Sequence, residues 1–342
     1  REQLVARIKI MARLNIAERR MPQDGKIRFK LGEMEIELRV VTLPTAGENE
    51  DVVLRILAGS GAQSLGKMNL SPDYLRSIQN LVASPYGMML AVGPAGSGKT
   101  TTLHAMLGKV NAVEKKVWTV EDPVEITQPG LRQMQVNPQI GLSFASAMRS
   151  FLRADPDVIM VGEMRDEETA HMAIEASLTG HLVFSTLHTN NAPETITRLI
   201  DMGMEPFSFS DALLAVLAQR LARRLCDQCK VEYEASESER AEFSGYLGET
   251  ALSRLAGPGP LKLFRAEGCV ECENSGYRGR LPLHELLVNN DEIREAMQKK
   301  ATTAELRLLA EKNGMRTLLQ DGVAKCLQGL TDLKQVLAVC SR

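Results

Sequence analysis

The N-terminal part of the chain changes from helical to strand periodicity. Over residues 1–20, apolar side chains recur at helical spacing and oppose a run of Arg and Lys. The apolar positions of this stripe are Leu4, Ile8, Met11 and Ile16. Residues 26–57 alternate apolar and polar positions, which predicts paired strands with turns at Asp24-Gly25 and Leu31-Gly32. A stretch containing Gly and Ser at 59–66 predicts a boundary or linker.

The middle of the chain, residues 70–222, alternates short apolar runs with helical patterns. The runs that predict buried strands are 88–92, 117–121, 157–161 and 181–186. This alternation is typical of an α/β fold with a mostly parallel sheet. Residues 226–285 are rich in Cys, Gly and Glu, and residues 286–342 return to helical spacing. The glycines expected to interrupt these helices are Gly314, Gly322 and Gly329.

A phosphate-binding motif follows the first apolar run. The residues of the motif G-x-x-x-x-G-K-[ST], with the next helical position, are Gly93, Pro94, Ala95, Gly96, Ser97, Gly98, Lys99, Thr100 and Thr101. Its glycines let successive N–H groups face one anion. Lys99 is expected to reach the β- and γ-phosphates, and the Thr100 hydroxyl to hold Mg²⁺. The alternative, a chance glycine-rich turn, is disfavoured by the strand-loop-helix context, so the motif predicts a nucleoside triphosphate site.

Composition narrows the class of protein. A length of 342 residues predicts two or three domains, and the 44% hydrophobic and 25% charged fractions are those of a soluble globular chain. The net charge of −2 predicts no general affinity for nucleic acid or anionic lipid. No apolar run approaches the ~20 residues that span a bilayer, and no secretory signal is visible. The start at Arg1 predicts a piece of a longer chain.

Two acidic segments follow predicted strands. The first ends in Glu121-Asp122-Pro123 with Glu125 beyond it, and carboxylates at the carboxyl edge of a parallel strand lie beside the ligand crevice. One of them could orient and deprotonate an attacking water. The second, residues 157–163, is similar to a Walker B strand, with Glu163 expected to support Mg²⁺ through water. For each carboxylate, a solvated strand end is the alternative.

A third strand leads from His181 to His188 and its polar neighbours. His188 is placed to hydrogen-bond a γ-phosphate and to respond to its loss. The alternative for a single histidine is an ordinary structural role, against which the neighbouring Ser185, Thr186 and Thr189 favour a polar rim.

The cysteines fall into a metal-binding pattern. Two C-x-x-C pairs are separated by 39 residues, and two such knuckles can close a tetrahedral Cys₄ site for Zn²⁺. The expected ligands are Cys226, Cys229, Cys269 and Cys272. Redox disulfides are the rival interpretation, disfavoured in the reducing cytosol that this pattern suggests. Cys326 and Cys340 are expected to be ordinary thiols, and a closed four-ligand site predicts structural rather than catalytic zinc.

In these motifs the chain resembles the type II secretion and type IV pilus assembly ATPases, a family of hexameric traffic motors. The resemblance runs nearly end to end, over segments 7–11, 16–20, 93–100, 121–125, 153–157, 161–166, 179–190 and 217–221 and the cysteine pairs. It implies a RecA-like P-loop motor domain of α/β class, a small truncated α+β N-terminal domain, a tetracysteine zinc-binding subdomain and a C-terminal helical segment. The implied divisions are 1–65, 66–225, 226–285 and 286–342.

The resemblance also implies roles for single residues. Glu125 matches the catalytic glutamate that activates water, Glu163 the Walker B glutamate, and His181 and His188 the histidine box. Four arginines match those that approach the phosphates when the ring closes: Arg39, Arg55, Arg149 and Arg153. From the residues alone, a surface ion pair is the alternative for each arginine. The N-terminal domain is expected to be incomplete, because family members usually carry strands ahead of Arg7.

The implied function is an ATP-driven, Mg²⁺-dependent hexameric motor for type II secretion or pilus assembly. Its implied partners are further copies of the chain and an inner-membrane platform protein, with a cytoplasmic, peripheral location and neither nucleic acid binding nor membrane insertion. The tetracysteine motif favours the secretion and pilus-extension branch over pilus retraction. Two alternatives stay open: a P-loop ring translocase acting on nucleic acid, which the near-neutral charge supports little, and a nucleotide-gated scaffold, which intact Lys99, Glu125 and Glu163 disfavour.

Overall fold

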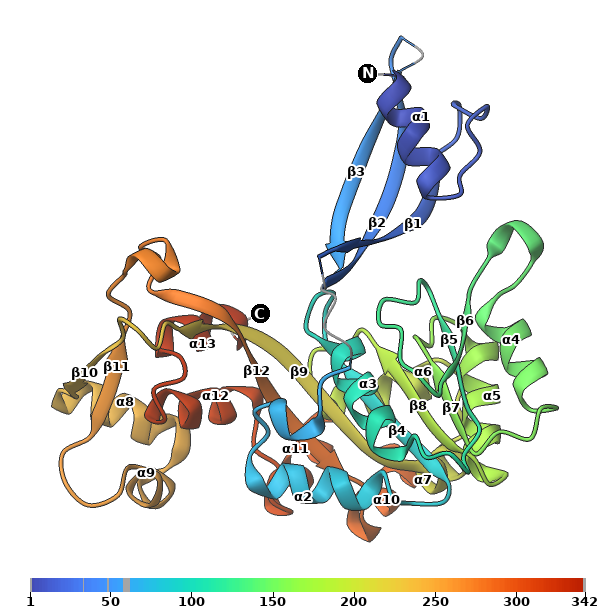
Figure 1. Cartoon of the computed structure of the whole chain (residues 1–342). Coiled ribbons are helices and arrows are strands. Elements are labelled where there is room, and N and C mark those ends of the chain that lie inside the picture. The colour runs from blue at the N-terminus through green and yellow to red at the C-terminus, as the bar shows by residue number, and fades with distance from the viewer. Residues whose placement is uncertain (1, 33, 48, 58–61, 341–342) are drawn as a thin grey trace. The chain divides into compact units, whose positions relative to one another are not determined.

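The computed structural model describes residues 2–32, 34–47, 49–57 and 62–340. The chain divides into two compact units, residues 1–61 and 62–342, each with its own fold (Figure 1). Among the described residues, no helix combines the length and the apolar character that crossing a bilayer requires. The predicted division into four regions stays a prediction.

The N-terminal unit is a three-stranded antiparallel sheet with one helix against it. Its elements are α1 (Glu2–Met11), β1 (Gln23–Leu31), β2 (Met34–Thr45) and β3 (Asn49–Leu57), with strand order β1-β2-β3. The core of the unit joins Ala12, Ile27 and Val40, all of them buried. The predicted paired strands are confirmed. The turn at Leu31-Gly32 is confirmed as well, but Asp24-Gly25 lies inside β1, where the absence of a side chain lets the end of α1 approach.

The helix predicted over residues 1–20 is shorter than predicted, and it buries a different face. It ends at Met11, where Arg13 takes a left-handed φ of 58° and the Leu14 N–H donates to the Lys9 carbonyl, a helix-ending motif. Leu4, Met11 and Ile16 of the predicted stripe are exposed, and Ile8 is only partly buried. The buried residues are instead Val5, Lys9 and Ala12. Sequence periodicity counted Lys9 as polar and therefore selected the neighbouring face.

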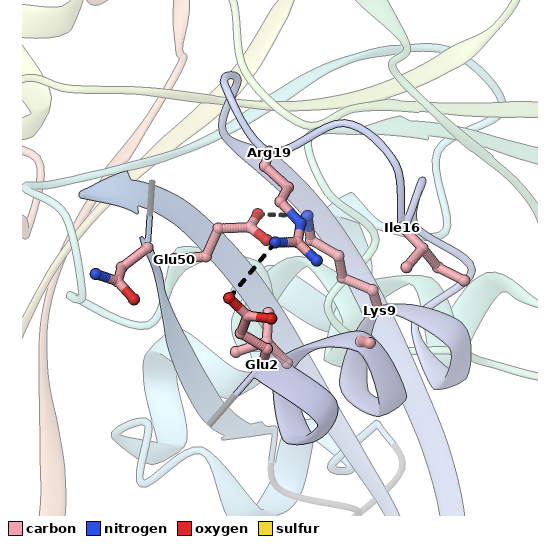
Figure 2. A pocket seen from close by; sticks show the side chains of 8 residues that line it. Glu2, Lys9, Ile16, Arg19 and Glu50 are labelled. Atoms are coloured by element: carbon pink, nitrogen blue, oxygen red, sulfur yellow. Dashed lines mark ion pairs between the residues drawn. The ribbon is translucent and has the colours of Figure 1, made fainter. Parts of the chain in front are cut away.

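Lys9 is fully buried and is compensated by carboxylate and carbonyl oxygens. Its ammonium forms an ion pair with Glu50 and donates to the Glu18 carbonyl at 2.7 Å. Figure 2 shows this group beside a cavity of about 20 Å³, with Arg19 and Glu2 paired at 3.8 Å across it. A cavity of that size holds about one water. The pocket is therefore a structural polar core rather than a ligand site.

The second unit is an α/β sandwich followed by a two-stranded sheet and C-terminal helices. Its strands are β4 (Gly87–Val92), β5 (Val117–Glu121), β6 (Arg132–Gln135), β7 (Val158–Val161), β8 (Leu182–Leu187), β9 (Leu213–Leu225), β10 (Val231–Glu234), β11 (Lys262–Arg265) and β12 (Tyr277–Val288). Its α-helices are α2 (Pro72–Leu81), α3 (Lys99–Val110), α4 (Phe144–Phe151), α5 (Glu167–Leu178), α6 (Ala192–Asp201), α7 (Pro206–Ala212), α8 (Glu237–Leu247), α9 (Glu249–Ala256), α10 (Asp291–Gln298), α11 (Thr303–Lys312), α12 (Leu318–Leu327) and α13 (Leu333–Cys340). Short 3₁₀ turns are Leu65–Lys67, Pro138–Ile140 and Val270–Cys272.

The central sheet has the strand order β12-β9-β4-β8-β7-β5-β6. All neighbours pair in parallel except β12, which runs antiparallel to β9. Alternate residues of β4 enter two separate cores. Met89 and Ala91 pack with residues of α2 and α3, whereas Met88, Leu90 and Val92 pack with residues of α4, α5 and α6. Helices thus cover both faces, and the predicted α/β fold with a mostly parallel sheet is confirmed.

The C-terminal region differs from the prediction in two places. Strand β12 runs across residues 285 and 286, where a region boundary was predicted. Gly322 lies inside α12 rather than ending it, and a Cβ there would lie 2.5 Å from a methyl group of Val336. The glycine permits close packing of α12 and α13. Gly314 and Gly329 do follow helix ends, with φ of 92° and 66°.

The buried pair of the N-terminal unit generates a stability prediction. Replacing Lys9 with Ala leaves the Glu50 carboxylate buried without its cation, so we expect the free energy of unfolding of this unit to fall by about 3–5 kcal/mol. Amide hydrogen exchange of β1–β3 measures the opening free energy of this unit separately. The control is Arg7→Ala, an exposed cation on the same helix. Lys9→Met with Glu50→Gln should recover most of the loss, and equal protection in Lys9→Ala and the control would refute the assignment.

Candidate functional site

The phosphate loop joins the central strand β4 to helix α3. Residues 93–98 form the loop, and Lys99, Thr100 and Thr101 form the first turn of α3. Gly93, Gly96 and Gly98 have φ of 145°, 75° and 90°, the region that favours glycine. The predicted strand-loop-helix arrangement is therefore present, with backbone N–H groups gathered at a helix N-terminus where anions bind.

Lys99 lies across its own loop. The ammonium donates to the carbonyl oxygens of Gly93 at 2.8 Å and Pro94 at 3.0 Å. Burial lowers the pKa of Lys99, an effect that the Glu163 carboxylate opposes and Arg220 reinforces. Glu163 and Arg220 are thus close enough to act electrostatically on the lysine.

Gln219 braces the loop from strand β9 and is almost completely buried. Its side-chain amide donates to the Ser97 carbonyl at 2.8 Å, and its amide oxygen accepts from the Thr102 hydroxyl at 2.6 Å. A Cβ on Gly93 would lie 2.5 Å from the Gln219 carbonyl oxygen. The glycine is needed here for close approach of two backbones as well as for its φ.

Acidic and cationic groups gather at the carboxyl ends of the neighbouring strands. Glu163 follows β7, forms an ion pair with Arg165 and lies 3.3 Å from His188 Nε2. Arg165 also reaches Asp122, after β5, at 3.5 Å. The hydrogen bond to Glu163 raises the pKa of Arg165. The structure therefore brings Glu163 and His188 together as neighbours.

The remaining predicted residues of the strand edges are divided between the two ends of the sheet. Glu125 is exposed in the loop after β5, at the carboxyl edge. His181 precedes β8, and Leu182 pairs with Gly87 at the start of β4. A strand of this length spans about 20 Å, so His181 lies at the edge opposite the phosphate loop. Its Nδ1 is 2.9 Å from the Ala176 carbonyl oxygen, and its predicted role at the nucleotide stays a prediction.

The four predicted arginines come from two places in the chain. Arg149, on α4, forms an ion pair with Glu168 of α5, and Arg153 is exposed just beyond α4. Arg39 and Arg55 are register partners on β2 and β3 of the N-terminal unit. Arg39 donates to Asp24 at 2.9 Å.

The four predicted thiols converge at one point. All four sulfur atoms, of Cys226, Cys229, Cys269 and Cys272, lie within 4.8 Å of one another. The Sγ···Sγ distances are 3.9 Å for Cys226–Cys269, 3.8 Å for Cys229–Cys272 and 3.7 Å for Cys269–Cys272. A tetrahedral ion with Zn–S bonds of about 2.3 Å separates its sulfurs by about 3.8 Å. The cluster therefore fits zinc in both donor type and size.

The surroundings of the thiols also suit a bound cation. Although burial by itself favours the neutral thiol, hydrogen bonds from the N–H groups of Cys269 and Gly276 and from neighbouring thiols lower the pKa of Cys272 to about 6, whereas burial and the shared thiol contacts raise the pKa of Cys229 to about 12. Both N–H groups lie 3.2 Å from its sulfur. Outside the cluster, Cys326 is buried and burial raises its pKa, as expected for an ordinary thiol.

Comparison with known proteins places this geometry in a family. A family model described as type II/IV secretion system protein matches residues 1–338. The chain belongs to the type II/IV secretion system protein family. The resemblance read from the motifs is confirmed.

Curated relatives come from both branches of this family. The chain is 46% identical over 336 residues to the type IV pilus assembly ATPase PilB of Thermus thermophilus, covering 98% of this chain and 37% of that protein. It is 47% identical over 337 residues to type II secretion system protein E of Xanthomonas campestris pv. campestris, covering 98% and 58%. The type II secretion system ATPase E of Vibrio cholerae is 44% identical over 339 residues, covering 98% and 65%. The chain thus spans 37–65% of the length of these three relatives.

Solved structures share the fold of this secretion-family chain. The pilus retraction motor PilT with bound ADP superposes with a TM-score of 0.66 at 26% identity, covering 93% of this chain and 77% of that one. The ATPase DotB of Yersinia pseudotuberculosis gives a TM-score of 0.69 at 19% identity, covering 99% and 82%. The second likeness concerns the fold alone. Together they support the predicted RecA-like P-loop class.

Sequence reasoning missed several residues of the site. Gln219 and Arg165 lie in segments that carried the family resemblance, but nothing in their spacing showed a contact with the loop or with Glu163. A buried cluster around His104 and Glu121 was missed as well, because the partners come from different elements. Their signal in the sequence is only that polar residues occupy positions where the pattern expects core.

Proposed function

We propose that this chain is the ATP-hydrolysing motor of a type II secretion or type IV pilus assembly machine. The observation that carries the proposal is the convergence of the phosphate loop, Glu163, His188 and Glu125 at the carboxyl edge of one parallel sheet. Ligands of open α/β sheets bind at that edge. The relatives named above are secretion and pilus assembly ATPases, which supports the same function.

A nucleoside triphosphate and Mg²⁺ fit the donor set of the edge. The loop N–H groups and Lys99 would hold phosphate oxygens, while the Thr100 hydroxyl and the Glu163 carboxylate offer the oxygen ligands that Mg²⁺ prefers, directly or through water. When bound, Mg²⁺ neutralises charge on the phosphates. The ammonium of Lys99 would exchange its two loop carbonyls for phosphate oxygens, which is a short movement of a flexible side chain.

Glu125 is the proposed general base. It is exposed beyond β5, where water has access, and it is not engaged in the ion pairs that hold Glu163. A carboxylate that accepts a proton from attacking water contributes about 10²–10⁴-fold to a rate. His188, 3.3 Å from Glu163, would hydrogen-bond the γ-phosphate and couple its loss to the Walker B residue.

The proposal includes an assembly of several copies. Arg149 and Arg153 lie on and just beyond α4, and Arg39 and Arg55 belong to the N-terminal unit, so the proposal has them act on a γ-phosphate through movement of units or from a neighbouring copy. A homo-hexameric ring on an inner-membrane platform protein, held peripherally on the cytoplasmic side, would supply both. The tetracysteine cluster favours the secretion and pilus-extension branch within this proposal.

We also propose that the cluster holds one structural Zn²⁺. Four thiolates complete a tetrahedral shell and leave no open position for catalysis. Cys226 follows β9 directly, and Tyr277 opens β12 a few residues after Cys272. The ion would therefore fasten the outer ends of two paired strands.

Two substitutions separate nucleotide binding from chemistry. Lys99→Ala removes a cation from the phosphates and should weaken ATP binding by roughly tenfold or more while abolishing turnover. Glu125→Gln should bind ATP within about twofold of wild type yet hydrolyse it roughly 10²–10⁴-fold more slowly. Binding is measured by isothermal titration with a slowly hydrolysed ATP analogue, and turnover by phosphate release. Glu114→Gln, exposed beyond α3, is the control; parallel loss of affinity in both test variants would contradict the general-base role.

Metal content tests the zinc proposal. Freshly prepared, reduced protein should contain about one Zn²⁺ per chain by elemental analysis. Cys226→Ser should lose the metal and expose residues 226–285 to proteolysis, since folding of such sites is tied to the ion. Cys340→Ser, a thiol outside the cluster, should keep full zinc content. Protein that is folded, reduced and free of zinc would overturn the proposal.

Ring assembly predicts a particular kinetic signature. Specific activity should rise with protein concentration as rings form. Arg39→Ala, Arg55→Ala, Arg149→Ala and Arg153→Ala should each lower kcat more than ATP affinity, because a cation supplied at closure acts on charge that develops in the transition state. Arg28→Ala, one row away on the same sheet face as Arg39, is the control. If a monomeric sample is highly active and none of the four substitutions lowers its kcat, the proposed ring closure is excluded.

A further inference from the structure

A buried polar cluster lies between the phosphate-loop helix and the acidic loop. His104 on α3 is completely buried, and Glu121, the last residue of β5, is 3% exposed. His104 Nε2 lies 3.3 Å from Glu121 Oε2. Since a carboxylate oxygen accepts, the ring nitrogen donates this hydrogen bond. The contact joins the helix that begins at the phosphate loop to the strand that ends at the acidic loop.

The same two side chains reach the loop that carries Glu125. His104 Nδ1 lies 3.0 Å from the side-chain oxygen of Gln128, a residue of that loop. Glu121 Oε1 accepts from the side-chain amide of Gln133 at 3.0 Å, and the same amide donates to the Ile126 carbonyl at 2.8 Å. Ile126 follows Glu125 directly. Two hydrogen-bonded paths thus run from α3 to the loop segment just after Glu125, one to Gln128 and one to the Ile126 carbonyl.

Both carboxylate oxygens of Glu121 are hydrogen-bonded. Glu121 Oε1 also accepts from the Thr119 hydroxyl at 2.7 Å, and the Gln128 N–H donates to Gln133 Oε1 at 2.8 Å. A buried carboxylate is costly unless hydrogen bonds compensate it, and an apolar pair of equal volume would fill the space without that cost. Hydrogen bonds at both oxygens hold the Glu121 side chain in one arrangement.

We propose that His104 and Glu121 are positioning residues that hold Glu125 in place for catalysis by tying its loop to the phosphate-loop helix. The inference rests on the proposed function, in which Glu125 activates water. Both side chains are buried, and the pair acts through Gln128, Gln133 and the Ile126 carbonyl. Its effect is therefore on turnover and not on the affinity for ATP, which the loop and Lys99 determine.

Three substitutions of His104 test its two hydrogen bonds, together and one at a time. His104→Phe keeps a ring and removes both bonds. His104→Gln keeps a donor where Nε2 meets Glu121, and His104→Asn keeps a polar group where Nδ1 meets Gln128. We expect kcat to fall about tenfold in His104→Phe with KM for ATP within about twofold, and about threefold or less in His104→Gln. Gln133→Leu, which cuts the path to Ile126, should reproduce the kcat loss.

A second measurement separates positioning from general destabilisation. All assays are run well below the melting temperature of each variant, and amide hydrogen exchange is followed in the full chain. In His104→Phe, exchange should rise in peptides covering residues 122–131 and stay unchanged in α5. In the Glu125→Gln background, His104→Phe should change kcat by less than about twofold, because residues that act as one unit are not additive.

The outcomes discriminate the inference from the function on which it rests. Full activity of Glu125→Gln alone contradicts the general-base assignment. An impaired Glu125→Gln beside an unimpaired His104→Phe overturns only the positioning role. The role is also overturned if KM rises in proportion to the loss of kcat, or if His104→Phe lowers kcat by the same factor in both backgrounds. Loss of kcat alone, rescue by Gln and non-additivity with Glu125→Gln support it.

Discussion

The common alignment of the parallel strands is the constraint on which the rest of the structure depends. Because β4, β8, β7 and β5 run in the same direction, the segments that follow them emerge at one edge. The phosphate loop, His188, Glu163 and the Glu125 loop come from distant parts of the chain and meet there for that reason alone. The helices on the two faces of the sheet bury alternate residues of β4 and so hold the strands that form this edge in place.

The sequence predicted what depends on local patterns and missed what depends on partners. The strands β4, β5, β7 and β8 and the phosphate loop follow from short apolar runs and glycine spacing, and the four thiols from C-x-x-C spacing. The apolar runs did not predict β6, β9 and β12. The buried face of α1 was wrong because Lys9 is compensated by Glu50, and the break at Gly322 was wrong because Val336 packs against it. His181 follows the same logic: its motif is continuous with His188, but the strand between them separates the two by its full length.

Several of the charged groups with proposed roles in ATP hydrolysis have a partner inside the chain. Lys99 binds two carbonyls, Glu163 binds Arg165, Arg149 binds Glu168 and Arg39 binds Asp24. A phosphate at the loop would replace these partners rather than meet free charges. Exchange of one satisfied arrangement for another costs little, which suits the repeated binding and release of nucleotide in the proposed function. The same argument explains why the exposed ion pairs need not contribute much stability.

Strand β9 connects the two centres of the larger unit. Gln219 in its second half braces the phosphate loop, and Leu225 at its end pairs with Tyr277 beside the thiol cluster. Farther along the paired strand β12, the His284 N–H donates to Asp321 of α12 at 2.8 Å, and the Glu285 carboxylate accepts from the backbone of Ala192 at 2.7 Å. The paired strands β9 and β12 are therefore held by the phosphate loop at one point, by buried helices in their middle and by the thiol cluster at their outer ends. A metal that fixes these strand ends would also stiffen the strands that support the phosphate loop. A structural metal would in this way still affect how the nucleotide site is held.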